Sequence, residues 1–137
     1  MPLRIGDPCP LLQVFDMPTS IAFYRDLLGF DVASDVPDDL RCDWVLLRLG
    51  DSELMLNTAY EADDRPDAPD QARVAAHRDT ALFFGCADVD EAFAYVGERG
   101  LDVKPPIVTS YGMKQLYLED PDGYVICFQQ PAGAHRP

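Results

Sequence analysis

The side chains in this sequence that could carry out chemistry are not spaced as a known catalytic or metal-binding motif requires. There are four cysteines, but they lack the close C-x-x-C spacing of a zinc site. The two histidines, His77 and His135, lie outside the predicted strands and offer no base that would activate a cysteine. No serine stands in a G-x-S-x-G turn. We therefore predict no catalytic residue.

Carboxylates are abundant, and two groups of them resemble functional motifs. The acids of residues 61–70 lack the D-x-D-x-D-G spacing of a calcium loop. Asp120 and Asp122 belong to the turn Asp-Pro-Asp-Gly, in which proline presets φ and Gly123 can adopt a positive φ. Both acids are more typical of turn capping than of a catalytic pair.

The elements that position these residues occur twice. Asp16 and Asp88 precede similar helical stretches and lie 72 positions apart (88 − 16), whereas the glycines that end them, Gly29 and Gly100, lie 71 apart (100 − 29). Aspartate caps a helix start and glycine ends a helix, so we predict helices over residues 18–28 and 89–99. A strand pair follows each helix, over 44–49 with 54–58 and over 115–119 with 124–129. This pattern indicates a single α+β domain of two modules, about 8–60 and 79–131, joined by an acidic, mobile connector over about 60–78.

Alternation along the strands predicts one apolar face, which must meet the helices, and one mixed face. Aromatic and amide side chains on the second face are typical of a pocket that binds a flat ligand. Tyr111, just before the 115–119 strand, adds another aromatic ring. We name these candidate ligand-binding residues the mixed face: Gln13, Trp44, Arg48, Glu53, Met55, Asn57, Phe83, Tyr111, Gln115, Tyr117, Cys127 and Gln129.

Composition narrows the classes of partner. Hydrophobic residues make up 47% and charged residues 26% of the chain, which are values of a globular protein. The net charge is −13, with only two lysines, and such a charge repels nucleic acids and anionic membranes. No apolar run approaches the roughly 20 residues of a membrane span. We expect a cytoplasmic protein that binds a small molecule, with neither nucleic acid nor membrane as a partner.

Three segments resemble the glyoxalase/bleomycin-resistance/dioxygenase group, also called the vicinal oxygen chelate superfamily. They are PLLQVFD at 10–16, AFYRDLLGF at 22–30 and YLEDPDGYVI at 117–126, and the likeness extends over about residues 9–131. The resemblance implies two βαβββ modules whose sheets curl around a shared cavity, in a homodimer. Metal-dependent members place ligands in the first and last strands of each module.

The resemblance assigns those ligand positions to Cys9, Met55, Ala81 and Cys127. A hard or borderline divalent ion needs nitrogen and oxygen ligands, which these residues do not supply. The sequence is thus more similar to the metal-free, drug-sequestering members, and we expect no metal, no cofactor and no enzymatic activity. A soft site for Cu(I) built from Cys9, Met55 and Cys127 remains an alternative.

Three functions stay open at this point. The first is sequestration of an aromatic or cationic ligand, such as an antibiotic, to which Glu53 would contribute a negative charge. The second is a metal-dependent lyase, isomerase or dioxygenase whose ligands are displaced from the usual positions. The third is an interaction module whose sheet faces are covered by a second copy, without an open pocket.

Overall fold

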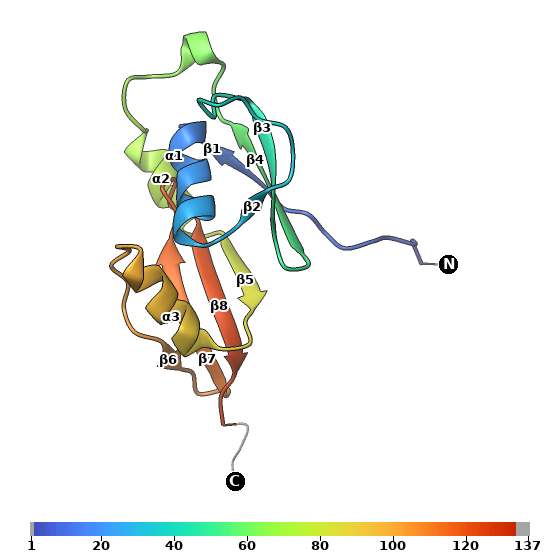
Figure 1. Ribbon diagram of the computed structural model, residues 1–137, viewed down its shortest axis with the longest axis vertical. Coiled ribbons are helices and arrows are strands. Elements are labelled where there is room, and N and C mark those ends of the chain that lie inside the picture. Colours follow the sequence, from blue (N-terminus) through green and yellow to red (C-terminus); the bar gives the residue numbers. More distant parts are fainter. Residues whose placement is uncertain (1, 134–137) are drawn as a thin grey trace.

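The chain folds into two consecutive modules, each a four-stranded sheet with a helix against one face (Figure 1). The computed structural model describes residues 2–133. The first module comprises β1 (Leu11–Val14), α1 (Met17–Ala22), the π-helix η1 (Phe23–Leu27), β2 (Asp31–Val32), β3 (Trp44–Leu49) and β4 (Ser52–Thr58). The second comprises β5 (Ala81–Gly85), α3 (Val89–Glu98), β6 (Ile107–Val108), β7 (Met113–Glu119) and β8 (Val125–Pro131). Between them lie the short η2 (Ala62–Asp64) and α2 (Gln71–His77).

The two sheets have the same strand order, β1-β4-β3-β2 and β5-β8-β7-β6. In each, the first and last strands are parallel and the other pairs are antiparallel. Met55 pairs with Leu11 in the first sheet, and Cys127 pairs with Phe83 in the second. Each residue of the second pair lies 72 positions after its counterpart in the first (127 − 55 and 83 − 11). The predicted α+β fold of two βαβββ modules is confirmed, and β3 has the predicted bounds.

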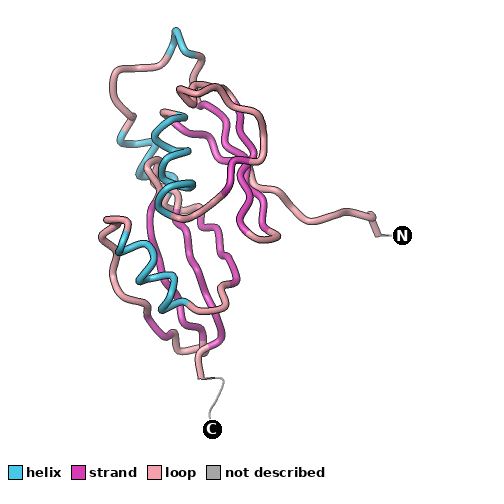
Figure 2. Tube along the Cα trace, in the orientation of Figure 1, coloured by secondary structure: helices cyan, strands magenta, loops and turns pink. Residues whose placement is uncertain are grey.

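The predicted aspartate caps start both module helices. The Asp16 carboxylate accepts the N–H of Thr19 at 3.3 Å, and the Asp88 carboxylate accepts the N–H of Glu91 at 3.0 Å. Each bond satisfies one of the backbone donors that a helix start leaves without a partner. Both helices lie on the same side of the molecule in the tube view (Figure 2).

The helix predicted over 18–28 is present as α1 followed by the π-helix η1, so only its first half is α-helical. Asp16 and Gly29 are 13 positions apart (29 − 16), whereas Asp88 and Gly100 are 12 apart (100 − 88). A π-turn takes up one more residue than an α-turn, so it accommodates the extra residue of the first copy. Both glycines have φ +88°, as the predicted helix ends require.

The core lies between the helices and the apolar sheet faces. Its strand residues include four that are fully buried, which are Leu54, Leu56, Leu116 and Ile126. An aromatic contact links the modules, because the Phe30 ring of the first lies 6.0 Å from the Phe84 ring of the second, which in turn lies 5.7 Å from Phe128 between ring centroids. Among residues 2–133, no helix is long and apolar enough to cross a membrane.

Within the connector, residues 71–77 form the helix α2, which the sequence did not predict. Asp70 caps this helix by accepting the N–H of Ala72 at 3.0 Å. His77 stacks on Tyr124 with ring centroids 4.0 Å apart, and its Nδ1 lies 2.7 Å from the carbonyl oxygen of Asp122. These tertiary contacts hold α2 in place against the second module.

Asp122 joins the connector and both modules. One carboxylate oxygen accepts the N–H of Phe15 at 2.8 Å and pairs with the Arg73 guanidinium at 2.9 Å. The other accepts the Ser20 hydroxyl at 3.3 Å. The Asp122 side chain is only 2% exposed. We call Phe15, Ser20, Arg73, His77 and Asp122 the Asp122 cluster.

Asp120 caps its turn as predicted, since its carboxylate accepts the N–H of both Asp122 and Tyr124 at 2.9 Å. It also accepts the Tyr24 hydroxyl, from η1 of the other module, at 2.6 Å. Burial raises the pKa of Tyr24 well above its ordinary value, so this hydroxyl stays a donor. Burial also raises the pKa of Asp120 from 3.8 to about 6, against the opposing effect of the hydrogen bond from Tyr24.

The Asp120 carboxyl should make stability depend on pH. Because its pKa is higher in the folded than in the unfolded chain, its contribution is fully present below pH 3.8 and is lost as the pH rises through about 6. We expect the free energy of unfolding to fall by about 1 kcal/mol more in the wild type than in Asp120→Asn between pH 5 and 7. Urea unfolding at both pH values measures this. An equal decrease in the free energy of unfolding for the two proteins would contradict the raised pKa.

Candidate functional site

Strand register places most of the predicted mixed face in rows across the two sheets. In the first module, Asn57 of β4 lies between Gln13 of β1 and Trp44 of β3. In the second, Cys127 of β8 lies between Phe83 of β5 and Tyr117 of β7, with Gln115 paired to Gln129 in the next row. Tyr111 lies in the turn before β7. The structure thus brings the predicted residues together as two groups, one on each sheet.

The mixed face is open within the single chain, because the two sheets do not close around a cavity. Its aromatic side chains are partly exposed, with Trp44 at 45%, Phe83 at 48%, Tyr117 at 39% and Tyr111 at 70%. Phe83 and Tyr117 meet edge to face, with ring centroids 6.0 Å apart. Large aromatic groups exposed together are typical of a binding surface.

Gln115 fixes the polar groups of the second sheet. It is 2% exposed, and its amide nitrogen donates to the Tyr111 hydroxyl at 3.2 Å and to the Gln129 carbonyl oxygen at 3.1 Å. Its own carbonyl oxygen accepts the Tyr117 hydroxyl at 2.9 Å. This network leaves the Gln129 amide nitrogen and the Tyr111 hydroxyl hydrogen free to donate outward, since neither has an acceptor within residues 2–133.

The polar groups of the first sheet differ from those of the second sheet in two ways. Asn57 has a buried side-chain oxygen that accepts no hydrogen bond from the described part of the chain. Such an orphaned acceptor is unfavourable unless a ligand or water supplies a donor. Glu53 does not offer a free negative charge, because both Nε and Nη2 of Arg48 donate to it, at 3.2 and 2.6 Å. The expectation that Glu53 attracts a cation is therefore weakened by a pairing that the sequence does not reveal.

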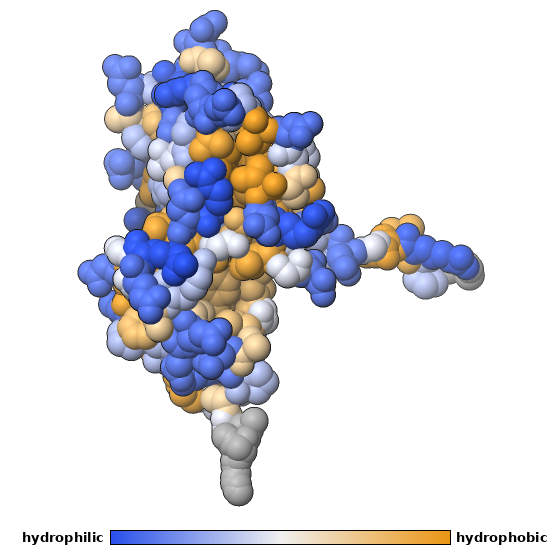
Figure 3. All heavy atoms as spheres, in the orientation of Figure 1, coloured by the Kyte–Doolittle hydropathy of each residue, from blue (hydrophilic) through white to orange (hydrophobic). Residues whose placement is uncertain are grey.

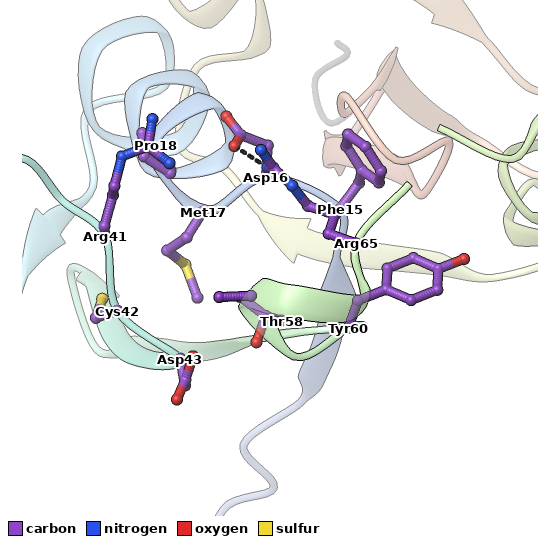
Figure 4. Close-up of a pocket in the computed structure, with 11 residues that line it drawn as sticks. Phe15, Asp16, Met17, Pro18, Arg41, Cys42, Asp43, Thr58, Tyr60 and Arg65 are labelled. Carbon is purple, nitrogen blue, oxygen red and sulfur yellow. Dashed lines mark hydrogen bonds and ion pairs between the residues drawn. The ribbon is translucent and has the colours of Figure 1, made fainter. Parts of the chain in front are cut away.

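A pocket that sequence reasoning missed lies at the end of the first module (Figure 4). Because residues of the connector line it, we call it the connector pocket. Its volume is about 210 Å³, and Met17 points into it from α1 toward Thr58 of β4 (Figure 4). Arg65 of the connector pairs with Asp16 and lies 5.0 Å over the Phe15 ring. The lining residues are Phe15, Asp16, Met17, Pro18, Arg41, Cys42, Asp43, Thr58, Tyr60, Ala62 and Arg65. The signal in the sequence was Tyr60 and Arg65, which stand next to and among the acids of residues 61–70.

Residues 8–128 match the sequence pattern of the Glyoxalase/Bleomycin resistance protein/Dioxygenase superfamily. The chain belongs to this superfamily. It is 29% identical over 117 residues to the uncharacterized protein YaeR of Escherichia coli K12, with 79% of this chain and 82% of YaeR covered.

Solved structures share the fold. TnmS3, described as an antibiotic binding protein from Streptomyces sp. CB03234, superposes with a TM-score of 0.68 and 26% identity, over 95% of this chain and 99% of its own. A bleomycin-binding protein in complex with bleomycin superposes with a TM-score of 0.66 and 20% identity, over 92% and 98% of the two chains. The second likeness supports the superfamily fold alone.

The residues that the resemblance assigns to the superfamily's metal positions do not fit a hard or borderline divalent ion. Cys9 precedes β1, Ala81 has no donor atom, and Met55 has only a thioether. Burial raises the pKa of the Cys127 thiol, which disfavours the thiolate that a metal would need. Within residues 2–133, no group of three or more histidine, cysteine or acidic side chains is arranged to hold a metal ion.

The two histidines do not complete such a site in the superfamily arrangement. His77 is engaged with Asp122 and Tyr124, on the opposite side of the strand pair from the mixed face. His135 lies outside the described residues. The candidate site is therefore the open mixed face, which stays a prediction from the sequence, and the connector pocket is a separate feature of the structure.

Proposed function

We propose that this superfamily member binds a small planar ligand on its mixed face and releases it chemically unchanged. The observation that carries the proposal is the group of exposed aromatic rings around the buried, fully hydrogen-bonded Gln115. Rings supply flat contact area at low conformational cost, and a fixed amide network orients polar groups of the ligand. The lack of suitable ligands at the superfamily's metal positions supports binding without a metal.

The polar groups suggest the chemistry of the ligand. Acceptor atoms on one edge of the molecule would meet the donors of Gln129 and Tyr111. The net charge of −13 favours a cation. An aromatic antibiotic of this kind is consistent with the antibiotic-binding description of TnmS3.

We further propose that a homodimer covers the mixed face and completes the cavity that one chain leaves open. The exposed aromatic rings support a covering partner, because isolated monomers rarely expose such patches. We place this dimer in the cytoplasm. The four cysteines are free thiols, as is usual in a reducing compartment.

Ligand binding should change the fluorescence of Trp44, the only tryptophan of the chain. We expect a saturable change when bleomycin or a planar aromatic cation such as ethidium is added, with calorimetry giving the dissociation constant. Phe83→Ala should weaken binding about five- to tenfold, because it removes a stacking surface.

The matched control is Tyr60→Ala, which removes an aromatic ring from the connector pocket and should leave that constant unchanged. If Tyr60→Ala weakens binding and Phe83→Ala does not, the ligand occupies the connector pocket. Recovery of a chemically altered ligand at a steady rate would contradict the proposal of binding without conversion.

A second candidate is an interaction module that uses the mixed face for dimer contacts alone. Exposed apolar side chains on this side of the sheets favour it, since Leu11 is 48% and Ile107 53% exposed. Sedimentation combined with Trp44 emission distinguishes the two functions. A dimer with buried, ligand-insensitive Trp44 would support the interaction module, and a dimer whose emission responds to ligand would support the binding protein.

A further inference from the structure

An apolar groove of about 310 Å³ lies between the two modules, on the helix side of the sheets. Leu28 and Leu49 of the first module and Phe84, Ala92 and Phe128 of the second contribute to its walls. Phe84 and Phe128 alternate with the mixed-face residues Phe83 and Cys127 along their strands, so they point to the other side of the sheet. Figure 3 shows apolar surface between the modules on this side. The groove is thus separate from the mixed face.

Two polar groups of α3 line the groove one helical turn apart. They are the Glu91 carboxylate and the Tyr95 hydroxyl, which stand at positions i and i+4 of one helix face. Neither group forms a side-chain hydrogen bond or ion pair within residues 2–133. The Tyr95 ring is held in place by the Arg99 guanidinium, which lies 3.4 Å from the ring centroid.

Gly29 provides the space in which the Tyr95 hydroxyl lies. A Cβ atom at this position would be 2.7 Å from that hydroxyl oxygen, and the glycine has φ +88°. The hydroxyl therefore reaches the first module and lies across the boundary between the two. Ser52, in the turn that begins β4, adds a second hydroxyl to the same lining.

The lining selects a type of ligand. Its walls are leucine, phenylalanine and alanine side chains, and the single charged residue among the described lining residues is Glu91. An anion would find no positive side chain there, and it would also face a net charge of −13. A protonated amine would gain a charge-assisted hydrogen bond to the free carboxylate while its apolar part leaves water. The volume is near the lower end of the roughly 300–1,000 Å³ of ligand pockets, which indicates a small molecule.

We propose that this groove is a second ligand site, which takes a small molecule with an apolar body and one protonated amino group. Glu91 binds the amine, Tyr95 and Ser52 offer hydroxyl oxygens beside it, and the leucine and phenylalanine side chains enclose the apolar body. The site depends on both modules, but it shares no residue with the mixed face. It therefore does not depend on the function proposed for that face.

The experiment is a titration of the full ¹⁵N-labelled chain, followed by amide chemical shifts, with 4-phenylbutylamine as the probe. We expect saturable shifts at the amides of Gly29, Gly85 and Ala92, without a change in Trp44 emission. The neutral 4-phenylbutanol should bind at the same amides about tenfold more weakly, because it lacks the charge. The anion 4-phenylbutyrate should bind more weakly still.

Two variants of α3 make the test specific. Glu91→Gln should reduce the affinity for the amine about tenfold, to that of the alcohol, and should leave the affinity for the alcohol unchanged. Glu98→Gln removes the same charge from the other end of the helix and should change neither affinity. Equal binding of amine and alcohol, insensitivity to Glu91→Gln, no saturable shift, or shifts centred on Trp44 and Tyr117 would each overturn the proposal.

Discussion

Replacement of Asp122 by alanine should lower the free energy of unfolding by about 3–5 kcal/mol, as expected when one partner of a buried ion pair is removed. The carboxylate is almost completely inaccessible, and it binds the backbone of Phe15, the hydroxyl of Ser20 and the guanidinium of Arg73. The N–H of Phe15 and the hydroxyl of Ser20 would lose their acceptor, and the Arg73 side chain, only 17% exposed, would lose the carboxylate that balances its charge. Urea unfolding followed by circular dichroism measures the change.

The control is Glu119→Gln, which breaks the exposed ion pair between Glu119 and Arg78. That pair also joins the segment around α2 to the second module, but both side chains are about half exposed, so its loss should cost less than about 1 kcal/mol. If the two variants had similar stability, the buried Asp122 contacts would contribute no more to folding than an exposed ion pair.

Gly123→Ala should destabilise the protein by about 2–4 kcal/mol and displace α2 from the second module. The glycine has φ +88°, and an added Cβ atom would overlap the carbonyl oxygen of Val74. A backbone atom cannot move aside as the end of a flexible side chain can, so the helix itself must shift. We base the magnitude on the strain of a positive φ together with overpacking. Faster hydrogen exchange at the α2 amides would report the displacement.

Gly100→Ala provides the matched control. Gly100 has the same φ of +88°, but an added Cβ atom would meet nothing within 4 Å. It should therefore show only the cost of the backbone conformation, about 1 kcal/mol. Equal destabilisation by the two substitutions would mean that the contact between Gly123 and Val74 is not important for α2.

Local sequence patterns were sufficient to predict most of the fold. Asp16 and Asp88 cap their helices, and Gly29 and Gly100 end them, because capping and positive φ depend on a few neighbouring residues. The alternation in β4 and β8 showed which side chains are buried, because strand side chains point alternately to the two faces. The one-residue offset between the copies was visible, but the π-helix that accommodates it was not inferred.

Features that depend on contacts between distant segments could not be predicted. Helix α2 has no apolar stripe, and tertiary contacts of Arg73 and His77 fix its place. The turn chemistry of Asp120 and Asp122 was recognised, but their bonds to Tyr24, Ser20 and Phe15 lie about 100 positions away in the sequence. For the site, alternation gave the members of the mixed face. It could not show that Arg48 neutralises Glu53 or that the sheets stay open.

The long sequence separation of the Asp122 cluster affects the order in which the chain folds as it leaves the ribosome. Phe15 emerges early, but its partner Asp122 is 107 positions further along the sequence. At roughly 5–20 residues per second, synthesis takes about 5–20 s to cover that distance. Throughout this interval the newly made first module lacks its bonds to the second. It is then exposed to proteases and to association with other nascent chains, and chaperones have their best opportunity to act on it.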